Sequence, residues 1–366
     1  MNKKIKICHL TTAHTYDDTR IFLKQCVSLS KKYNVSLINI NSPNELTTLK
    51  NTTLININYK AKNRIKRFLF TTYKVYKRAK LLNADVYHFH DPDFIPYGIL
   101  LRLNGKKVIY DIHESYGLSL LDRDYIPSIL KKPIAHMFNI FEKTTSRYFN
   151  YLIPATPFIE SEFIKFNHKK KTINNYPILN ELKTDSSSTK REDAICFVGN
   201  ISKERGFYEM IKATKKTKTK LYLAGNIPKE LKKELSNNTH VIYLGFINRK
   251  EYANLIQKCI AGFVIYHPSN NHINSQPNKL FEYMSAELPI IGSNFSLWKK
   301  IIEENKCGIC CDPLNINSIV NAINWMKENK KQLTLMGKNG FNSVKKIYNW
   351  KVEEKKLFNI YEEVIK

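Results

Sequence analysis

The chain has 366 residues, which is long enough for two domains that each bury a hydrophobic core of their own. Its apolar content of 43% is that of a globular protein, and no apolar run is long enough to argue for a membrane-spanning helix. The net charge is +27, with 59 Lys plus Arg against 32 Asp plus Glu, so the composition favours anionic partners: a phosphorylated substrate, an acidic lipid or a nucleic acid.

The seven cysteines and the start of the sequence bear on the compartment. Seven is an odd count, and the cysteines are scattered through strand-like stretches, which favours a reduced cytoplasmic setting. The first residues, MNKKIKICHL, lead directly into a strand-like segment. We therefore expect no signal peptide.

The N-terminal half alternates short apolar strands with helical patterns. The predicted strands are Ile5–Leu10, Val35–Ile40, Asp85–His90, Lys107–Ile112 and Tyr151–Pro154. This rhythm predicts a parallel sheet with ligands at the carboxyl ends of its strands. His14, Asp18 and Arg20, in the loop after the first strand, either face such a ligand or are solvated.

A strongly basic stretch separates the second and third of these strands. Leu46–Ala84 contains ten basic residues and no acidic one, and Arg64–Leu82 within it has the period of an amphipathic helix with aromatic residues on one face. Such a helix is typical of a membrane-surface element, attracted to anionic lipid. Its membrane-facing charges would be Arg67, Lys74, Lys77 and Arg78. The alternative is a helix packed on the sheet by its apolar face, with solvated charges.

Two strand ends in this half carry residues that could do chemistry. Asp91 and Asp93 flank a proline after one strand, and we interpret this D-x-D as a strand-end turn rather than a metal site, so no metal or cofactor is expected. Asp91 would then be able to reach an acceptor hydroxyl. His113 follows the next strand and lies on the functional edge of the predicted sheet.

The C-terminal half repeats the strand–helix rhythm behind a polar, serine-rich linker, residues 183–190. In the loop Gly199–Gly206, glycine permits close approach of a ligand and Arg205 can clamp a diphosphate with two donors. In Ser275–Gly292, a helix beginning at Pro277 would present free N–H groups to a phosphate, and Glu282, one turn inside, could hold sugar hydroxyls.

These two stretches resemble the donor-binding signature of family 4 retaining glycosyltransferases of the GT-B fold. Glu282 matches the second glutamate of the family's Glu-x7-Glu pattern, which binds ribose, whereas Asn274 stands where the family has the first glutamate. The family's loop carries an arginine and then a lysine for the phosphates, and here Asn200 and Arg205 occupy those positions. In the family a histidine placed like His113 lies against the donor sugar.

The resemblance implies two Rossmann-like α/β domains facing each other across a cleft. Residues 1–182 would bind the acceptor, 191–349 the nucleotide sugar, and 350–366 would form a helix that returns to the N-terminal domain. The expected reaction moves a sugar from a nucleotide-diphosphate sugar, UDP-linked in the first instance, to a hydroxyl of a glycan or lipid-linked acceptor, with retention and without a metal. A role in bacterial surface-polysaccharide synthesis on the inner face of the plasma membrane would follow.

The resemblance also proposes a set of site residues. His113 would be catalytic, and His14, Asp18 and Asp91 would lie on the acceptor side. The expected donor-binding residues are Gly199, Asn200, Arg205, Asn274, Pro277, Asn278, Lys279 and Glu282. Two other functions stay open: a sugar-nucleotide epimerase of the same fold, and a nucleic-acid-binding protein. The latter lacks a recognisable module with base-stacking aromatic residues.

Overall fold

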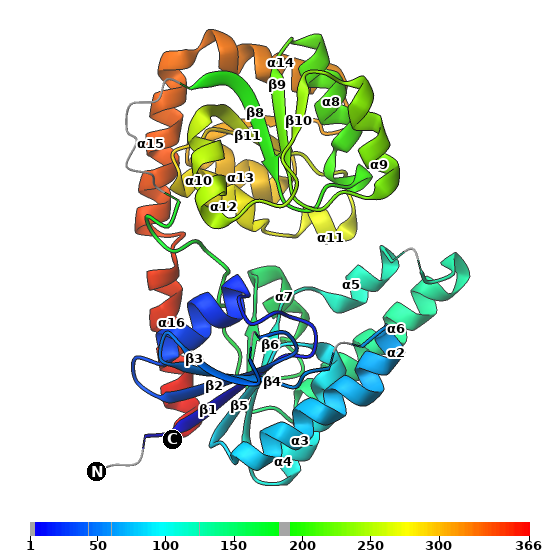
Figure 1. Cartoon of the computed structure of the whole chain (residues 1–366), viewed down its shortest axis with the longest axis vertical. Coiled ribbons are helices and arrows are strands. Elements are labelled where there is room, and N and C mark those ends of the chain that lie inside the picture. The colour runs from blue at the N-terminus through cyan, green and yellow to red at the C-terminus, as the bar shows by residue number, and fades with distance from the viewer. Residues whose placement is uncertain (1–3, 43, 60, 124, 183–190) are drawn as a thin grey trace. The chain divides into compact units, whose positions relative to one another are not determined.

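The structure is a computed structural model that describes residues 4–42, 44–59, 61–123, 125–182 and 191–366. The chain divides into two compact units (Figure 1). The N-terminal unit comprises Met1–Asn175 with Lys351–Lys366, and the C-terminal unit comprises Tyr176–Trp350. The predicted linker, residues 183–190, lies outside the described residues.

The N-terminal unit is built on a seven-stranded sheet of order β3-β4-β2-β1-β5-β6-β7 among the described residues. All neighbouring strands are parallel except the β3–β4 pair. The strands are β1 (Lys6–Leu10), β2 (Asn34–Asn39), β3 (Leu46–Leu49), β4 (Thr52–Asn56), β5 (Val86–Phe89), β6 (Lys107–Ile112) and β7 (Tyr151–Pro154). Every residue of β5 is buried, as expected for a central parallel strand covered on both faces.

Helices flank this sheet on both sides (Figure 1). They are η1 (Thr19–Cys26, π-helical), α1 (Val27–Leu29), α2 (Arg64–Lys66), η2 (Arg67–Thr71, π-helical), α3 (Thr72–Leu82), η3 (Pro92–Phe94), α4 (Ile95–Leu103), α5 (Tyr116–Leu121), α6 (Ser128–Ser146), α7 (Pro157–Glu162) and α16 (Trp350–Ile365). The predicted return of the C-terminal helix is confirmed, since Tyr361 on α16 bonds to His88 on β5 with an oxygen–nitrogen distance of 2.7 Å.

The predicted amphipathic helix 64–82 forms as α2, η2 and α3 in continuous succession. It differs from the alternative of a helix packed on the sheet by its large apolar side chains. The side chains that pack on the unit are the small ones, among them Thr72, Val75 and Ala79. Aromatic and aliphatic residues of the other face remain exposed: Ile65 is 72% exposed and Tyr73 is 51% exposed. Of the aromatic residues of this helix, Tyr76 packs against the core, whereas Phe68, Phe70 and Tyr73 are exposed.

The C-terminal unit has a wholly parallel sheet of order β10-β9-β8-β11-β12-β13 among the described residues. Its strands are β8 (Glu192–Val198), β9 (Lys220–Ala224), β10 (Val241–Tyr243), β11 (Cys259–Val264), β12 (Ile290–Ser293) and β13 (Gly308–Cys311). Its helices are η4 (Lys203–Arg205, 3-10), α8 (Phe207–Lys216), α9 (Lys229–Lys233), η5 (Glu234–Asn237, 3-10), α10 (Arg249–Lys258), α11 (Asn270–Ile273), α12 (Asn278–Ser285), α13 (Ser296–Glu304), α14 (Ile316–Glu328) and α15 (Lys330–Lys346).

The strand orders place one topological switch point in each sheet. The chain leaves β1 towards β2 and later returns to β5 on the other side of β1, and β8 is flanked in the same way by β9 and β11. Ligands of open parallel sheets bind beyond the carboxyl ends of the strands at such points. The candidate sites are therefore the loops after β1 and β5 in one unit and after β8 and β11 in the other. No described helix is long and apolar enough to cross a membrane.

Candidate functional sites

The loop after β8 brings the backbone close to a buried lysine. Gly199 has φ +130°, which only glycine adopts readily, and a Cβ atom there would lie 3.3 Å from Nζ of Lys279. Gly206, with φ +70°, closes the loop and precedes α8, and a Cβ atom there would collide with Ile265 at 2.7 Å. The glycines thus shape a cradle between this loop and α12.

Lys279 is the most unusual side chain of this cradle. It is 7% exposed, and its Nζ lies 3.4 Å from the ring centroid of Phe197 and donates no hydrogen bond within the described part of the chain. Burial, and next the positive charge of Arg205, hold the pKa of Lys279 well below its usual value. A buried, unpaired ammonium group costs several kcal/mol, so a fold that keeps one indicates an anionic ligand.

Arg205 lies beside Lys279 at the end of η4. Its Nη1 donates to the backbone oxygen of Asn200 at 3.2 Å, and its guanidinium lies 5.2 Å from the ring centroid of Tyr266. The Nζ of Lys279 lies 5.5 Å from the same ring. Tyr266 and Phe197 are thus part of the cradle, and sequence reasoning missed both because nothing distinguishes them from core aromatic residues.

Helix α12 carries the remaining predicted donor residues. It begins at Asn278 directly after Pro277, so the predicted start of the helix is confirmed. Asn278 is exposed on its first turn. Asn274 ends the preceding helix α11, and its amide nitrogen donates to the backbone oxygen of Asn270 at 3.0 Å. The side-chain oxygen of Asn274 is the atom that remains for a ligand.

Glu282 is held in a network of its own. Its Oε1 accepts from Nη1 of Arg249 at 2.8 Å, and its Oε2 accepts from the hydroxyl of Tyr252 at 3.1 Å. Arg249 also donates through Nε to Glu181 at 3.0 Å. Burial lowers the pKa of Arg249, but these two carboxylates outweigh burial and raise it, so Arg249 stays charged. Glu282 is thus fixed in position by Arg249 and Tyr252.

In the N-terminal unit, Asp91 and Asp93 are occupied by donors from the protein. Oδ2 of Asp91 accepts from Oγ1 of Thr11 and from the backbone N–H of Thr12, both at 2.7 Å. Asp93 accepts from Oγ1 of Thr12 and from Nε of Arg67, both at 2.8 Å. Carboxylates saturated in this way favour a rigid strand-end turn over a cation site. Arg67, proposed to face a membrane, has its guanidinium on Asp93.

His14 and Asp18 form an ion pair next to Asp91. Nδ1 of His14 lies 3.0 Å from Oδ2 of Asp18, and its Nε2 lies 3.6 Å from Oδ1 of Asp91. Burial lowers the pKa of His14, but Asp18 and Asp91 outweigh it and raise the pKa to about 9, so His14 is cationic at neutral pH. Asp18 also caps η1, because its Oδ1 accepts from the backbone N–H groups of Arg20 and Ile21.

His113 completes this group. Its side chain is 16% exposed, and its ring centroid lies 5.2 Å from that of His14. Its Nε2 lies 3.3 Å from Oδ2 of the fully buried Asp111. The structure thus brings together the predicted catalytic and acceptor-side residues at one edge of the sheet. Arg20, predicted to face a ligand or solvent, is instead 4% exposed and bonded to Asp111.

A cavity of about 530 Å³ opens at this edge. Its polar wall includes His14, Asp91 and Asp93. Its opposite wall is apolar and comes from η2, α5 and α6: Phe68, Tyr116, Leu120, Phe138 and Phe141. A polar floor with aromatic walls suits a sugar that is attached to an apolar group.

Comparison with known proteins identifies the fold. Residues 180–343 match the family model of glycosyl transferases group 1. No curated protein sequence matches the chain. The structure resembles sucrose-phosphate synthase from Thermosynechococcus elongatus, with a TM-score of 0.80 at 14% identity over 99% of both chains. It also resembles Anabaena Alr3699/HepE in complex with UDP and glucose, with a TM-score of 0.74 at 13% identity, over 98% of this chain and 99% of that one.

A third similar structure is WaaG, a glycosyltransferase involved in lipopolysaccharide biosynthesis, with a TM-score of 0.68 at 13% identity over 97% of this chain and 99% of that one. The chain therefore has the GT-B fold, as its sequence implied. The matched family model covers Gly199, Arg205, Lys279 and Glu282. The fold and this match together support a glycosyltransferase.

Proposed function

We propose that the protein transfers a sugar from a nucleotide-diphosphate sugar to a hydroxyl of a glycan or lipid-linked acceptor, with retention of configuration. The observation that carries this proposal is the buried, unpaired Lys279 beside Gly199 and Arg205 at the switch point of the C-terminal sheet. UDP-linked donors are the first to test, because HepE has been solved with UDP, with UDP and glucose, and with UDP-glucose. Retention rests on the resemblance alone.

The diphosphate is the leaving group of this reaction. As the bond between the sugar and the diphosphate breaks, negative charge grows on the phosphate oxygens. Lys279, Arg205 and the N-terminal N–H groups of α12 would stabilise that charge, because they are held in position before the reaction. Glu282, held by Arg249 and Tyr252, would accept hydrogen bonds from the ribose hydroxyls.

Donor binding tests the proposal directly. Glu282→Gln and Arg205→Ala should each weaken binding of a nucleotide sugar about ten- to hundredfold, because each loses a charge-assisted hydrogen bond. Binding is measured as thermal stabilisation across a panel of nucleotide sugars, and turnover as release of the nucleotide, with the same result in EDTA.

Glu181→Gln is the matched control, because it weakens the same Arg249 network without removing a ligand-binding group. Equal donor affinity in all variants would refute the proposed site. Conversion of the donor without any acceptor would indicate an epimerase, and tighter, salt-sensitive binding of nucleic acid would indicate the third alternative. Activity lost in EDTA and restored by manganese would make Asp91 and Asp93 metal ligands.

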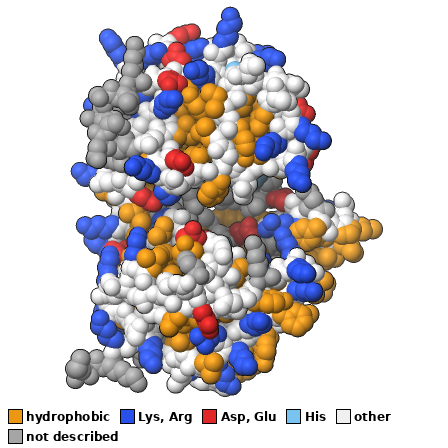
Figure 2. All heavy atoms as spheres, viewed as in Figure 1, with side chains coloured by type: hydrophobic (Ala, Val, Ile, Leu, Met, Phe, Trp, Pro, Cys, Tyr) orange, Lys and Arg blue, Asp and Glu red, His pale blue; other side chains and the backbone are white. Residues whose placement is uncertain are grey.

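The surface around the N-terminal cavity supports a lipid-linked acceptor and peripheral attachment to a membrane. Large apolar side chains, each at least 38% exposed, cover the helix 64–82 and α6: Ile65, Phe68, Leu69, Phe70, Tyr73, Ile129, Leu130, Ile134, Met137, Ile140 and Phe141. Hydrophobic side chains gather over this side of the unit in Figure 2. Both helices border the cavity, through Phe68 and Phe138. We call this the apolar ridge.

Basic residues accompany the ridge. Arg64, Lys66 and Lys132 are exposed next to it, and Lys74 and Lys77 are exposed further along the helix. Arg78 is partly exposed, and its Nη2 lies 3.9 Å from Oε1 of Glu45. Apolar side chains that insert below the headgroups, bordered by cations, suit an anionic lipid surface.

Vesicle flotation should therefore depend on the apolar ridge. We expect the protein to float with anionic vesicles, to be released as salt rises, and to ignore neutral vesicles. Serine at Ile129, Met137 and Ile140 should abolish flotation and leave donor binding intact. In the otherwise unchanged protein, exchange of Lys74, Lys77 and Arg78 for Glu should also weaken flotation, since each basic residue near the lipid contributes about 1 kcal/mol.

A matched control removes the same kind of side chain from the other unit: serine at Leu244, Phe246 and Leu335, which are 41%, 83% and 60% exposed. This variant should float like the parent. If the ridge variant floats equally well, the ridge does not bind lipid and the acceptor is soluble.

A further inference from the structure

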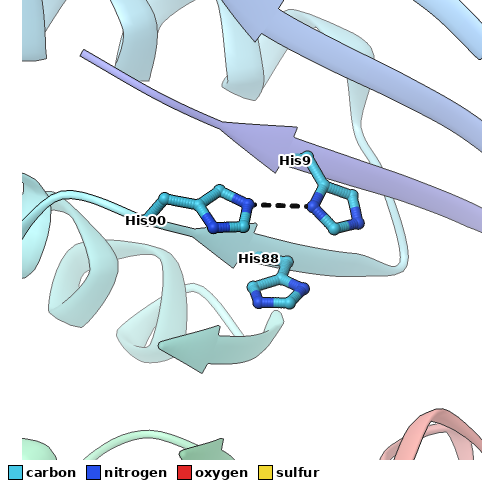
Figure 3. Close-up of side chains that lie close together, drawn as sticks. All are labelled: His9, His88 and His90. Carbon is cyan, nitrogen blue, oxygen red and sulfur yellow. Dashed lines mark hydrogen bonds between the residues drawn. The ribbon is translucent and has the colours of Figure 1, made fainter. Parts of the chain in front are cut away.

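A row of buried histidines runs through the N-terminal unit to the edge of the sheet. His9 on β1, His88 on β5 and His90 directly after β5 are all 0% exposed (Figure 3). Burial lowers the pKa of each of them, to about 3 for His90, so all three are neutral. A neutral imidazole has one N–H donor and one bare acceptor nitrogen, so every contact in the row has a direction.

Asp111 on β6 sets that direction. Burial raises the pKa of Asp111, but nearby positive charge, chiefly that of Arg20, outweighs burial and holds this pKa well below its usual value. Oδ2 of this carboxylate accepts from Nε of Arg20 at 3.0 Å and from Nε2 of Gln25 at 2.8 Å, and Oδ1 accepts from Nη2 of Arg20 at 2.6 Å. An ionised carboxylate can only accept. Nδ1 of His90, 3.1 Å from Oδ2, must therefore carry a proton and donate.

Every further proton in the row follows from this one. With Nδ1 of His90 protonated, its Nε2 is bare and accepts from Nδ1 of His9 at 3.0 Å, the bond drawn in Figure 3. Nε2 of His9 is then bare and accepts from the hydroxyl of Tyr361 at 3.2 Å. The oxygen of Tyr361 accepts in turn from Nδ1 of His88 at 2.7 Å. The assignment leaves Nε2 of His88 bare, and this nitrogen has no hydrogen-bond partner among the described residues.

The same three rings lie close enough together to be considered as metal ligands. A metal between His9 and His90 would require both facing nitrogens to be bare. These nitrogens are 3.0 Å apart, the distance of a hydrogen bond, and the assignment that starts at Asp111 places a proton on Nδ1 of His9. The row is therefore a hydrogen-bonded chain.

His113 is attached to the end of this chain. Its Nε2 lies 3.3 Å from Oδ2 of Asp111 and 3.2 Å from Nδ1 of His90, whose proton is already directed to Asp111. A bare Nε2 would face the lone pairs of the carboxylate and be repelled. Nε2 of His113 therefore carries a proton, and in the neutral ring Nδ1 is bare.

We propose that Asp111 is a positioning residue that holds His113 as the Nε2–H tautomer, so that its bare Nδ1 accepts a hydrogen bond from a sugar hydroxyl. Arg20, Gln25, His90, His9 and Tyr361 hold Asp111 and its partners in place. The tautomer follows from the hydrogen-bond geometry around the ionised Asp111, whereas the sugar rests on the proposed function. A substrate that lacks this hydroxyl would leave the acceptor nitrogen of His113 without a partner in the complex and would be discriminated against.

The tautomer is tested without substrate, by long-range ¹H–¹⁵N spectra of protein labelled with ¹⁵N in its histidine rings. We expect a protonated Nε2 and a bare Nδ1 in the neutral ring of His113, with His113→Gln identifying its signals. A protonated Nδ1 with a bare Nε2 would overturn the proposal, and so would bare facing nitrogens on His9 and His90. UDP-glucose and free glucose are then added. A shift of the Nδ1 signal with either probe supports the sugar contact, and binding without a shift overturns it.

Two substitutions separate positioning from stability. Asp111→Asn presents an amide donor to His113 and should invert its tautomer, with turnover lowered about a hundredfold and donor affinity kept. Tyr361→Phe removes the hydroxyl that joins His9 to His88 and should change the signals of these two residues but not those of His113. If Asp111→Asn does not fold, the spectra of the parent and of Tyr361→Phe decide. If neither probe binds at all, the proposed function fails while the tautomer result stands.

Discussion

Replacing Lys279 with methionine is expected to abolish turnover while raising the melting temperature of the C-terminal unit. The ammonium group is buried, without a hydrogen-bond partner among the described residues, against the ring of Phe197. Methionine fills a similar volume without the cost of burying a charge, and such exchanges commonly stabilise by about 1–4 kcal/mol. Loss of one or two charge-assisted bonds to the diphosphate should lower donor affinity about a hundredfold or more.

The matched control is Lys300→Met, which removes an exposed lysine from the same unit and should change neither property. Turnover and thermal unfolding of the two variants are compared in the same buffer. A destabilised Lys279→Met protein would show that the ammonium group stabilises the fold, and the argument for an anion-binding cradle would fall.

Proton uptake on donor binding gives an independent test of the role of Lys279. Because the pKa of Lys279 lies well below its usual 10.5 without ligand, a bound diphosphate should raise it again, so binding takes up a proton. Donor affinity should therefore increase as the pH is lowered from 10.5. Calorimetry in two buffers with different ionisation enthalpies measures the uptake, which should disappear in Lys279→Met.

Local patterns in the sequence predicted the strands and the C-terminal cradle. Apolar runs between polar loops predicted β1, β5, β6 and β7, and the proline before a helical pattern predicted the start of α12. Such features depend on neighbouring residues only. By contrast, Pro133 would mark a helix boundary by its local pattern, but it lies inside α6, residues 128–146. A helix can accept a proline where tertiary packing outweighs the lost bond.

The buried chain in the N-terminal unit could not be predicted in this way. It joins residues as distant as His9 and Tyr361, which are 352 positions apart. Strand residues such as His88 carry no local sign that their partner is on another strand or on the last helix. Arg20 illustrates the same limit, since a charged loop residue reads as solvated until its buried partner Asp111 is known. These side chains are placed by partners that are far away in the sequence, which local patterns do not reveal.

The buried histidines predict a steep loss of stability in acid. His9, His88 and His90 remain unprotonated in the folded state, whereas in the unfolded chain they take up protons as the pH falls below about 6.5. The unfolded state then binds more protons, so the free energy of unfolding decreases as the pH falls, by about 1.4 kcal/mol per pH unit for each histidine.

One buried carboxyl opposes them between pH 6.5 and 4.5. Glu142, bonded to Tyr110, has its pKa raised to about 8 by burial, so it is protonated in the folded state and ionised in the unfolded one. Its effect on the pH dependence of the free energy of unfolding therefore cancels that of one histidine. His14, whose pKa is raised to about 9, is protonated in both states there and contributes nothing. The net loss equals that of two histidines, roughly 3 kcal/mol per pH unit.

This loss should be confined to the N-terminal unit, and the chain offers a way to see it. Trp298 and Trp325 lie within the C-terminal unit, whereas Trp350 is its last residue and begins α16, so the fluorescence of a Trp350→Phe protein reports on the C-terminal unit alone. Hydrogen exchange of the amides of β1 and β5 reports on the N-terminal unit.

Between pH 6.5 and 4.5 the exchange of the amides of β1 and β5 should accelerate steeply, while the tryptophan fluorescence remains that of the folded protein. His88→Leu should reduce the slope by one proton, and His136→Gln, which alters an exposed histidine on α6, should leave it unchanged. If the exchange rate does not change with pH, or if both variants show the same slope, the buried histidines take up protons in the folded state. The fixed directions of their hydrogen bonds would then be wrong.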